Sequence, residues 1–387
     1  MSVPAAGKAA IHQLPAIAYK RIVVKAGTNV LTKRTPKLSA EVMSNLVGQI
    51  GAVRRIGAQV ILVTSGAIAA GREALGAPHD GKAVPIRQML AAVGQSRLMH
   101  TYQELFSRDA TVVAQALLTR HDVEDRVGYL NVRRTLDGLL NANVVPIVNE
   151  NDVVDTEEIG QERFGDNDTL SALVANLIDA DLLIMLTDTG GLYTTDPNRD
   201  PNARLIPRVE RIDASIMALA EAHRSTVSRG GMASKLQAAK RATASGVTVV
   251  IAAGTESDVV TRVAAGEPVG TLFLPTATHV EARKRWLLSG ISQGTGQLVV
   301  DQGAAKALCS QHRSLLPAGV RGVRGAFLRG DVVGIITADG EQVACGICNY
   351  DADDLRQIAG VRSDQILARL GHHYGDEAVH RDNLVLL

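Results

Sequence analysis

The sequence predicts an α/β protein with a mostly parallel sheet sandwiched by helices, followed by a small C-terminal β-barrel domain. Apolar, strand-like runs alternate with helix-like periodic segments through residue 273, as in repeated βα units. Hydrophobic residues make up 46% of the chain and aromatic residues only 3%, a balance typical of aliphatic parallel-sheet cores. After Phe273 the strands become short and closely spaced, which predicts the barrel.

The first part of the chain supplies the predicted sheet and its covering helices. Apolar residues recur at helical spacing from Ser39 to Ile56, and Ser39 is the expected N-cap of that helix. The other predicted helices are Pro85–Phe106, Asp122–Leu140 and Leu170–Ile178. The predicted strands are Ile22–Val24, Val60–Val63, Val112–Leu118, Val144–Val148, Leu182–Leu186 and Val247–Ile251. This alternation places the carboxyl ends of parallel strands at one edge of the sheet.

The second part begins after a predicted linker at Leu274–His279, which contains Pro275. Its predicted strands are Trp286–Leu288, Gln297–Val300, Val332–Thr337 and Gln342–Ile347. We therefore expect two domains, at residues 1–275 and 281–387, with residues 1 to about 18 as a disordered extension.

The composition argues against several classes of function. Lys and Arg total 41 against 40 Asp and Glu, so no net charge favours nucleic acid or a membrane surface. No apolar run is long enough to span a bilayer, and the first residues lack the apolar core of a signal peptide. The three cysteines suggest no disulfide framework, which indicates a reducing, cytoplasmic compartment.

The most informative segment runs from Val144 to Ile178, where a buried strand, a polar loop and a core-facing helix follow one another. Short polar side chains gather at the strand end and the helix start, namely Asn149, Glu150, Asn151, Asp152, Asp166, Asn167 and Asp168. Ligands of open α/β sheets bind at this position. Carboxylates only accept hydrogen bonds, whereas amides also donate them, so this set suits a zwitterion.

Pieces of a phosphate site lie at other predicted strand and helix ends. Lys25 follows the first strand, and Thr187 and Asp188 follow another strand before a Gly-Gly turn. A third piece opens a helix with Arg229, Gly230, Gly231, Met232, Ala233, Ser234 and Lys235. Glycines let the backbone approach an anion, and a helix N-terminus offers free N–H groups. Lys25 and Lys235 would meet over a phosphoryl group if the ends of their elements are neighbours.

Seven sequence blocks resemble glutamate-phosphorylating members of the amino acid kinase family, in that family's order. They are VVKAGTNVLT, LVTSGAIAAGRE, LAAVGQSRLM, PIVNENDVV, FGDNDTLSALVA, LTDTGGLYTTDP and GGMASKLQAA, within roughly residues 20–273. The later segment SLLPAGVRGVRGAFLRGDVVGI resembles a PUA domain. The resemblance implies that ATP phosphorylates the γ-carboxylate of L-glutamate to γ-glutamyl phosphate, the first step of proline biosynthesis.

The resemblance also implies roles for individual residues. Lys25 and Lys235 would bind the nucleotide phosphates and the transferring phosphoryl group, and Asp168 would orient both lysines. The implied glutamate-binding residues are Ser65, Asp152 and Asn167, with Asn149 and Asp166 close by. The implied ATP-binding residues are Thr187, Asp188 and the loop Arg229–Lys235. This chain has Arg229 where the family usually has a small residue, and an inward-pointing arginine would add a cation beside the nucleotide.

The implied reaction needs no general base. The γ-carboxylate has a reference pKa of about 4.3 and is already an anionic nucleophile at neutral pH. Catalysis then rests on positioning and charge neutralisation. Mg²⁺ is expected to bind mainly through the phosphates of ATP, so no protein metal ligands are predicted. The labile product implies a γ-glutamyl phosphate reductase as functional partner, and the family context implies proline feedback and a homo-oligomer.

Two alternatives stay open at this stage. The first is another member of the family, an acetylglutamate or carbamate kinase, although the NEND and FGDND blocks favour glutamate. The second is an RNA-binding regulator acting through the PUA-like tail. Basic and acidic residues are equal in number from Glu281 to Leu387, which argues against RNA as a partner. Cys345 and Cys348 form a lone CxxC, for which a packing role is expected rather than a metal or redox role.

Overall fold

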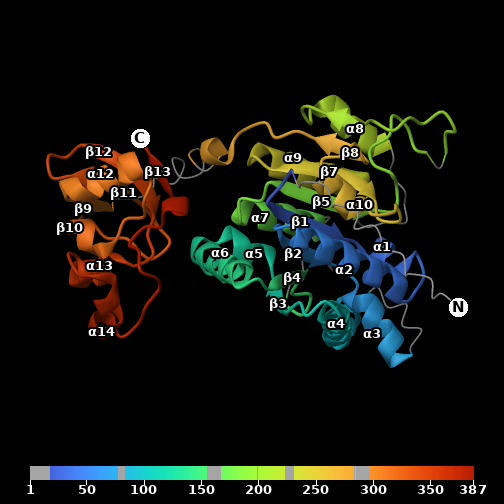
Figure 1. The fold of residues 1–387 in the computed structure, drawn as a ribbon, viewed down its shortest axis with the longest axis horizontal. Helices are drawn as coiled ribbons and strands as arrows, with labels where there is room; N and C mark the ends of the chain where they lie inside the picture. Colours follow the sequence, from blue (N-terminus) through green and yellow to red (C-terminus); the bar gives the residue numbers. More distant parts are fainter. Residues whose placement is uncertain are drawn as a thin grey trace, which may run out of the picture.

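The computed structural model describes residues 18–76, 83–154, 167–197, 199–222, 231–282, 284 and 296–387. Within these residues, two β-sheets belong to separate parts of the chain (Figure 1). Nearly all of the predicted N-terminal extension and all of the predicted strand Trp286–Leu288 lie outside the described residues. Among the helices described, none has both the length and the apolar character to cross a membrane.

The first sheet is mostly parallel, as predicted. Its described strands are, in spatial order, β3 (Val113–Leu118), β4 (Val145–Glu150), β2 (Gln59–Thr64), β1 (Arg21–Ala26), β5 (Leu182–Thr187), β7 (Thr248–Ala253), β8 (Thr271–Phe273) and β6 (Arg208–Val209). Only β7 and β8 pair antiparallel among them. Pairing aligns Ala26 of β1 with Thr64 of β2 and with Leu186 of β5, so these strands end at the same level.

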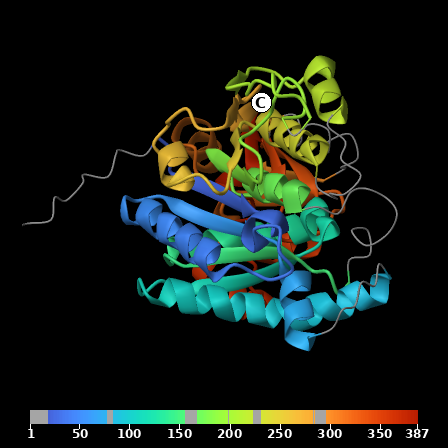
Figure 2. The same cartoon turned by 90° about the vertical axis from the view of Figure 1, so that its right-hand side faces the viewer.

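Helices cover both faces of this sheet (Figure 2). Val24 packs with α2 (Ala40–Arg55), α4 (Val84–Ser107) and α10 (Val259–Ala264), while the neighbouring Val23 packs with α6 (Arg126–Asn141), α7 (Asn167–Leu177) and α9 (Met232–Ala244). Successive strand side chains point to opposite faces, so a sheet buried on both sides needs continuous apolar runs. The remaining described helices of this part are α1 (Thr28–Thr32), α3 (Ala67–Leu75), α5 (Arg120–Glu124) and α8 (Ala214–Ala222).

Helix boundaries confirm one cap and correct one prediction. Ser39 is the N-cap of α2, and its hydroxyl accepts a hydrogen bond from the backbone N–H of Val42 at 3.4 Å. The single helix predicted over Asp122–Leu140 is wrong, because the chain breaks at Asp125. Asp125 adopts an extended conformation, and its carboxylate caps α6 by accepting from the Gly128 N–H at 2.8 Å. Capping by Asp125 favours the start of a new helix here. The apolar spacing continues across the break, so it predicted one helix instead of two.

The second sheet is smaller and mainly antiparallel. It has the order β10 (Val320–Arg324), β9 (Gln297–Val300), β11 (Val332–Thr337), β12 (Gln342–Ile347) and β13 (Leu384–Leu386). Its described helices are α12 (Gln302–Gln311), α13 (Ala352–Ile358) and α14 (Ile366–Leu370). A separate apolar core includes Leu298, Ile335 and Leu355. Helix α6 lies on the side of the first sheet that faces this second sheet (Figure 1).

Candidate active site

Several of the side chains predicted to be functional lie at strand ends on one edge of the first sheet. Lys25 is the fifth residue of β1, and Ser65 directly follows β2, where its N–H donates to the Ala26 carbonyl at 3.1 Å. Asn149 lies at the end of β4, and Thr187 ends β5. Because these strands are parallel, their polar ends converge on the carboxyl edge, where open α/β sheets bind ligands.

A buried cluster of two lysines and one carboxylate forms the centre of this edge. The Lys25 Nζ lies 2.5 Å from Asp168 Oδ1, and the Lys235 Nζ lies 3.0 Å from Asp168 Oδ2. The Ser234 hydroxyl donates to the same Oδ2 atom at 2.8 Å. Asp168 has no exposed surface, and Lys25 and Lys235 are 3% and 7% exposed. Strand β1, the first turn of α7 and the first turn of α9 thus meet at one point.

The charge of this cluster suits an anion. Two lysine ammonium groups contact the same carboxylate in a buried position. Charge-assisted hydrogen bonds are strong where water is excluded, so a phosphoryl group would be a favourable ligand for these two lysines. Gly231 is the N-cap of α9 and makes no side-chain capping hydrogen bond, and the N-terminus of a helix favours an anion.

Space around Lys25 depends on a glycine in the turn after β1. A Cβ atom at Gly27 would lie 3.2 Å from the Lys25 Nζ. Most Cβ contacts are wider than this, so a larger residue would push the ammonium group away from its position. The glycine therefore keeps room for the lysine tip at the strand end.

A chain of amide and hydroxyl groups lies beside the lysine cluster. The Asn167 Nδ2 donates to the Ser65 Oγ at 2.9 Å and to the Asn149 Oδ1 at 3.1 Å. The Asn149 Nδ2 donates in turn to the Gln95 Oε1 at 2.8 Å. Asn149 and Asn167 are buried. Since Asn167 is the neighbour of Asp168, the first turn of α7 joins this polar chain to the lysine cluster.

Gln95 was not singled out by sequence reasoning, although it lies within the quoted block LAAVGQSRLM. Its position depends on very close packing between α3 and α4. A Cβ at Gly94 would lie 1.8 Å from the carbonyl oxygen of Ala67, and one at Gly71 would lie 1.9 Å from that of Leu90. Only glycine fits at such distances. The pair of glycines brings Gln95 to the side of the sheet where Ser65 and Asn149 end their strands.

The remaining predicted substrate residues lie after β4. Asp152 is 9% exposed and sits two residues beyond the strand. Its position next to the amide chain in sequence fits a partner for a cationic group. Asp166 lies outside the described residues.

Asp188 holds the edge beside β5 through a cation that sequence reasoning missed. The Arg34 guanidinium donates to Asp188 Oδ2 at 2.8 and 3.1 Å, and Asn29 Nδ2 donates to the same atom at 3.4 Å. Partial burial raises the pKa of Asp188, but the hydrogen bonds and charge of Arg34 outweigh it and hold the pKa below its ordinary value. Thr187 also donates to Asp188 at 3.2 Å. Arg34 lies in a turn with a positive φ of 60°, which no hydrophobic pattern marks.

The glycine loop before α9 is only partly described. Gly231, Met232, Ala233, Ser234 and Lys235 are placed at the start of the helix, whereas Arg229 and Gly230 lie outside the described residues. No group of three or more His, Cys, Asp or Glu side chains could hold a metal ion within the part of the chain that is described. Cys345 and Cys348 are both buried, and burial raises the pKa of the Cys348 thiol to about 12.

Buried lysines at the carboxyl edge of a parallel sheet, next to a chain of amide and hydroxyl groups, are features that suit a kinase of small metabolites. The chain belongs to the amino acid kinase family, whose sequence profile matches residues 20–253. The profile of the PUA domain matches residues 296–370.

Relatives cover almost the whole chain. A protein of Dehalococcoides mccartyi (strain CBDB1) named glutamate 5-kinase is 48% identical over 369 residues, which cover 95% of this chain and 99% of the relative. The glutamate 5-kinase of Deinococcus radiodurans is 49% identical over 367 residues, covering 95% of this chain and 100% of that protein. That of Aliivibrio fischeri (strain ATCC 700601 / ES114) is 49% identical over 366 residues, with coverages of 95% and 98%.

Proposed function

We propose that this chain is a glutamate 5-kinase, which transfers the γ-phosphoryl group of ATP to the γ-carboxylate of L-glutamate. The names of the relatives support the substrate pair. The single structural observation that carries the proposal is the contact of Lys25 and Lys235 with Asp168, one residue from the amide chain through Asn167. An anion site and a zwitterion site are thereby held side by side.

The reaction needs positioning and charge neutralisation rather than a base. A glutamate carboxylate oxygen attacks the γ-phosphorus, the new P–O bond forms, and the bond to the ADP oxygen breaks. Lys25 and Lys235 would neutralise the charge that spreads over the phosphoryl oxygens, and Asp168 would fix both ammonium groups. The described donors fit a Mg²⁺ ion held mainly by the nucleotide phosphates, because Asp168 is engaged with lysines and Asp188 with arginine. Bound there, Mg²⁺ would neutralise phosphate charge.

We assign the other residues by the same logic. Ser65, Asn167 and Asn149 would donate hydrogen bonds to the carboxylate oxygens of glutamate. Asp152 and Asp166 would bind its ammonium group. Thr187, Asp188 and the loop 229–235 would frame the nucleotide. Arg229 would add a positive charge at the entrance of that loop.

The chemistry of the product sets the context of the reaction. An acyl phosphate hydrolyses readily, so we place a γ-glutamyl phosphate reductase next in the sequence, in the cytoplasm, with proline as feedback inhibitor. We also assign the kinase domain to residues 1–275 and the PUA domain to residues 281–387, and propose a homo-oligomer as the assembly.

One assay tests the proposed substrate. ATP consumption by the full chain with Mg²⁺ should depend on L-glutamate and be at least about tenfold lower with N-acetylglutamate, aspartate or carbamate, because these lack the free ammonium group or the chain length that the site needs. Trapping the product with hydroxylamine would identify the acyl phosphate. Turnover with N-acetylglutamate that exceeds turnover with glutamate would contradict the proposal.

A further inference from the structure

The C-terminal domain packs on one helix of the kinase domain, α6, through an apolar contact. Leu130 of α6 lies in a small buried cluster with Val332, Cys345, Ile347 and Val385 of the second sheet, and Tyr129 packs against it. Strands β11, β12 and β13 therefore each contribute at least one side chain to the apolar contact with α6. This small apolar cluster places the C-terminal domain in direct contact with α6.

Two glycines of the C-terminal domain allow this close approach. A Cβ at Gly375 would lie 1.7 Å from a guanidinium nitrogen of Arg134, and one at Gly330 would lie 3.1 Å from the Val127 side chain. Polar contacts surround the apolar patch. Arg329 donates to the Asn131 Oδ1 at 2.6 Å, and a guanidinium nitrogen of Arg126 lies 3.7 Å from an Asp331 carboxylate oxygen.

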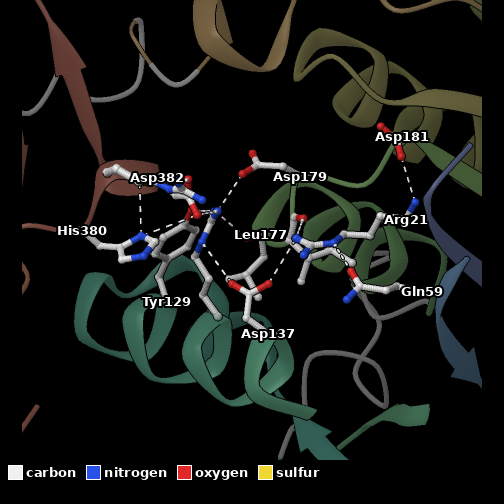
Figure 3. A network of polar contacts seen from close by, with 12 residues as sticks. Arg21, Gln59, Tyr129, Asp137, Leu177, Asp179, Asp181, His380 and Asp382 are labelled. Carbon is white, nitrogen blue, oxygen red and sulfur yellow. Dashed lines mark hydrogen bonds and ion pairs between the residues drawn. The ribbon is translucent and has the colours of Figure 1, made fainter. Parts of the chain in front are cut away.

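Arg133 of α6 connects this interface to the interior of the kinase domain. Its guanidinium is buried and lies 3.8 Å from Asp382 of the C-terminal domain. The same group donates to Asp179 at 2.6 Å and to the backbone carbonyl of Leu177 at 2.7 Å. Figure 3 shows Asp179 and Asp382 converging on one point above Asp137, which lies 3.7 Å from Arg133.

The Leu177 carbonyl belongs to the last turn of α7. Carbonyls of the last turn have no partner inside the helix, and cations at this end interact favourably with the helix dipole. Arg133 binds the carbonyl of Leu177, and Arg21 binds that of Ile178 at 2.5 Å. Asp137 lies 3.1 Å from Arg21 and so joins the two arginines.

Helix α7 carries the candidate catalytic groups at its other end. Its first two residues are Asn167 and Asp168, and the helix has 11 residues, a length of roughly 16 Å at 1.5 Å per residue. A regular helix of this length transmits a shift or a rotation from one end to the other. Holding its last turn therefore holds its first turn.

We propose that Arg133 is a positioning residue through which the C-terminal domain fixes α7, and with it Asp168 and Asn167. The docked domain keeps Asp382 beside the guanidinium, and the guanidinium keeps the end of α7 in register with β1. The kinetic consequence rests on the proposed function, whereas the consequence for α7 does not.

A charge reversal at the domain junction tests this. In the full-length Asp382→Arg protein, a second cation faces Arg133. We expect hydrogen exchange of the amides in Leu170–Ile178 to accelerate at least about threefold, and kcat with glutamate to fall about three- to tenfold, the size of a typical coupling between distant sites. The KM for ATP should change less. The Asp382→Glu protein, which keeps the negative charge, should behave like the wild type.

The matched control is Asp364→Arg, which reverses an exposed carboxylate that pairs with Arg362 inside the C-terminal domain at 3.5 Å. It should leave both readouts unchanged. A lower melting temperature for Asp382→Arg with unchanged α7 exchange and unchanged kcat would overturn the proposal and make the junction a purely structural contact.

Two further outcomes are separable. If Asp382→Arg fails to fold, Arg133→Lys gives the second test, because lysine keeps the charge but lacks the planar fork that binds Leu177 and Asp179 together. The same faster α7 exchange and lower kcat are expected, and their absence would count against the proposal. If the wild type shows no glutamate turnover but α7 exchange still responds to Asp382→Arg, the proposed function fails and the clamp on α7 stands.

Discussion

Strand β1 and helix α7 both run between two clusters of charged side chains. One cluster lies at the carboxyl edge of the sheet, by the end of β1 and the first turn of α7, and the other at the amino edge, by the start of β1 and the last turn of α7. At the carboxyl edge, Lys25 and Lys235 both contact the carboxylate of Asp168. At the amino edge, Arg21 and Arg133 are surrounded by carboxylates and backbone carbonyls, including Asp137 and Asp179. At the carboxyl edge two lysines meet at one carboxylate, whereas at the amino edge each arginine contacts a carboxylate and a backbone carbonyl at the end of α7. The first arrangement suits the binding of an anion, and the second joins elements of the fold to one another.

The network at the amino edge also shows how burial and neighbouring charges have opposite effects on a pKa. Desolvation raises the pKa of Asp137, although the neighbouring Arg133 and Arg21 lower it in part. Buried ion pairs roughly balance their desolvation cost, so we expect Asp137 to contribute little net stability. At the carboxyl edge a bound phosphoryl group would add a charge-assisted contact with the two lysines.

The largest expected effect comes from removing one of the two lysines at the carboxyl edge. Lys235→Ala should lower kcat by at least about a hundredfold, because it removes a cation that stabilises the transition state. The KM for glutamate should change little. Steady-state kinetics with both substrates varied measures the two parameters. The control is Lys240→Ala in the same helix, where the side chain is exposed and a normal kcat is expected. Near-normal turnover in Lys235→Ala would place the phosphate site elsewhere.

The next effect separates the two halves of the carboxyl edge. Asp152→Ala should raise the KM for glutamate by about tenfold or more, as expected for a lost hydrogen bond to a charged group. Its kcat and its KM for ATP should stay within about threefold. Val153→Ala is the neighbouring control, since Val153 is exposed. A raised KM for ATP with normal KM for glutamate would exchange the assignments of the two halves.

Removing the second domain tests the amino edge as a whole. A chain that ends at Pro275 keeps the apolar clusters of the first sheet and every described residue of the candidate site, so it should fold and turn over glutamate. It loses Asp382 and uncovers Leu130, so kcat should fall about three- to tenfold and the melting temperature should drop. Circular dichroism melting and ATP turnover against the full chain provide the measurements. A folded fragment with no turnover would mean that the second domain completes the active site.

The smallest effect concerns the pH dependence of stability at Asp188. Its folded pKa is depressed below the unfolded value, so its contribution is present above the unfolded pKa and is lost as pH falls through the folded one. Arg34→Gln should remove this acid-sensitive part and leave stability at neutral pH within about 1 kcal/mol, because Arg34 is largely exposed. Thermal melts between pH 3 and 7 would show it. An unchanged pH profile in Arg34→Gln would contradict the link.

Sequence reasoning reached the carboxyl edge because its residues follow apolar strands. The apolar runs that lead to Lys25, Asn149 and Thr187 predict parallel strands. The carboxyl ends of parallel strands lie at the same edge of a sheet. Gln95 has no such mark, because α4 is a long helix without a clear apolar stripe, and its position follows from the contact of Gly94 with the Ala67 backbone. Arg34 sits in an irregular turn.

The charged network at the amino edge could not be predicted from the sequence, for a different reason. Arg133 stands in a helical segment where an arginine is ordinary, and Asp382 lies almost 250 residues later in a charge-balanced tail. No local pattern encodes a pairing between two domains. The same holds for the break at Asp125, where a capping side chain outweighed a continuous apolar period.

Because α7 makes contacts at both of its ends, insertions and deletions within this helix should be poorly tolerated. One residue added between Asp168 and Leu177 would rotate one end of the helix relative to the other by about 100° and lengthen it by about 1.5 Å. Either Asp168 would leave the two lysines, or the Leu177 carbonyl would leave Arg133. Functional relatives should therefore vary in side chains along this helix while keeping its residue count fixed. Insertions should instead lie outside the helix.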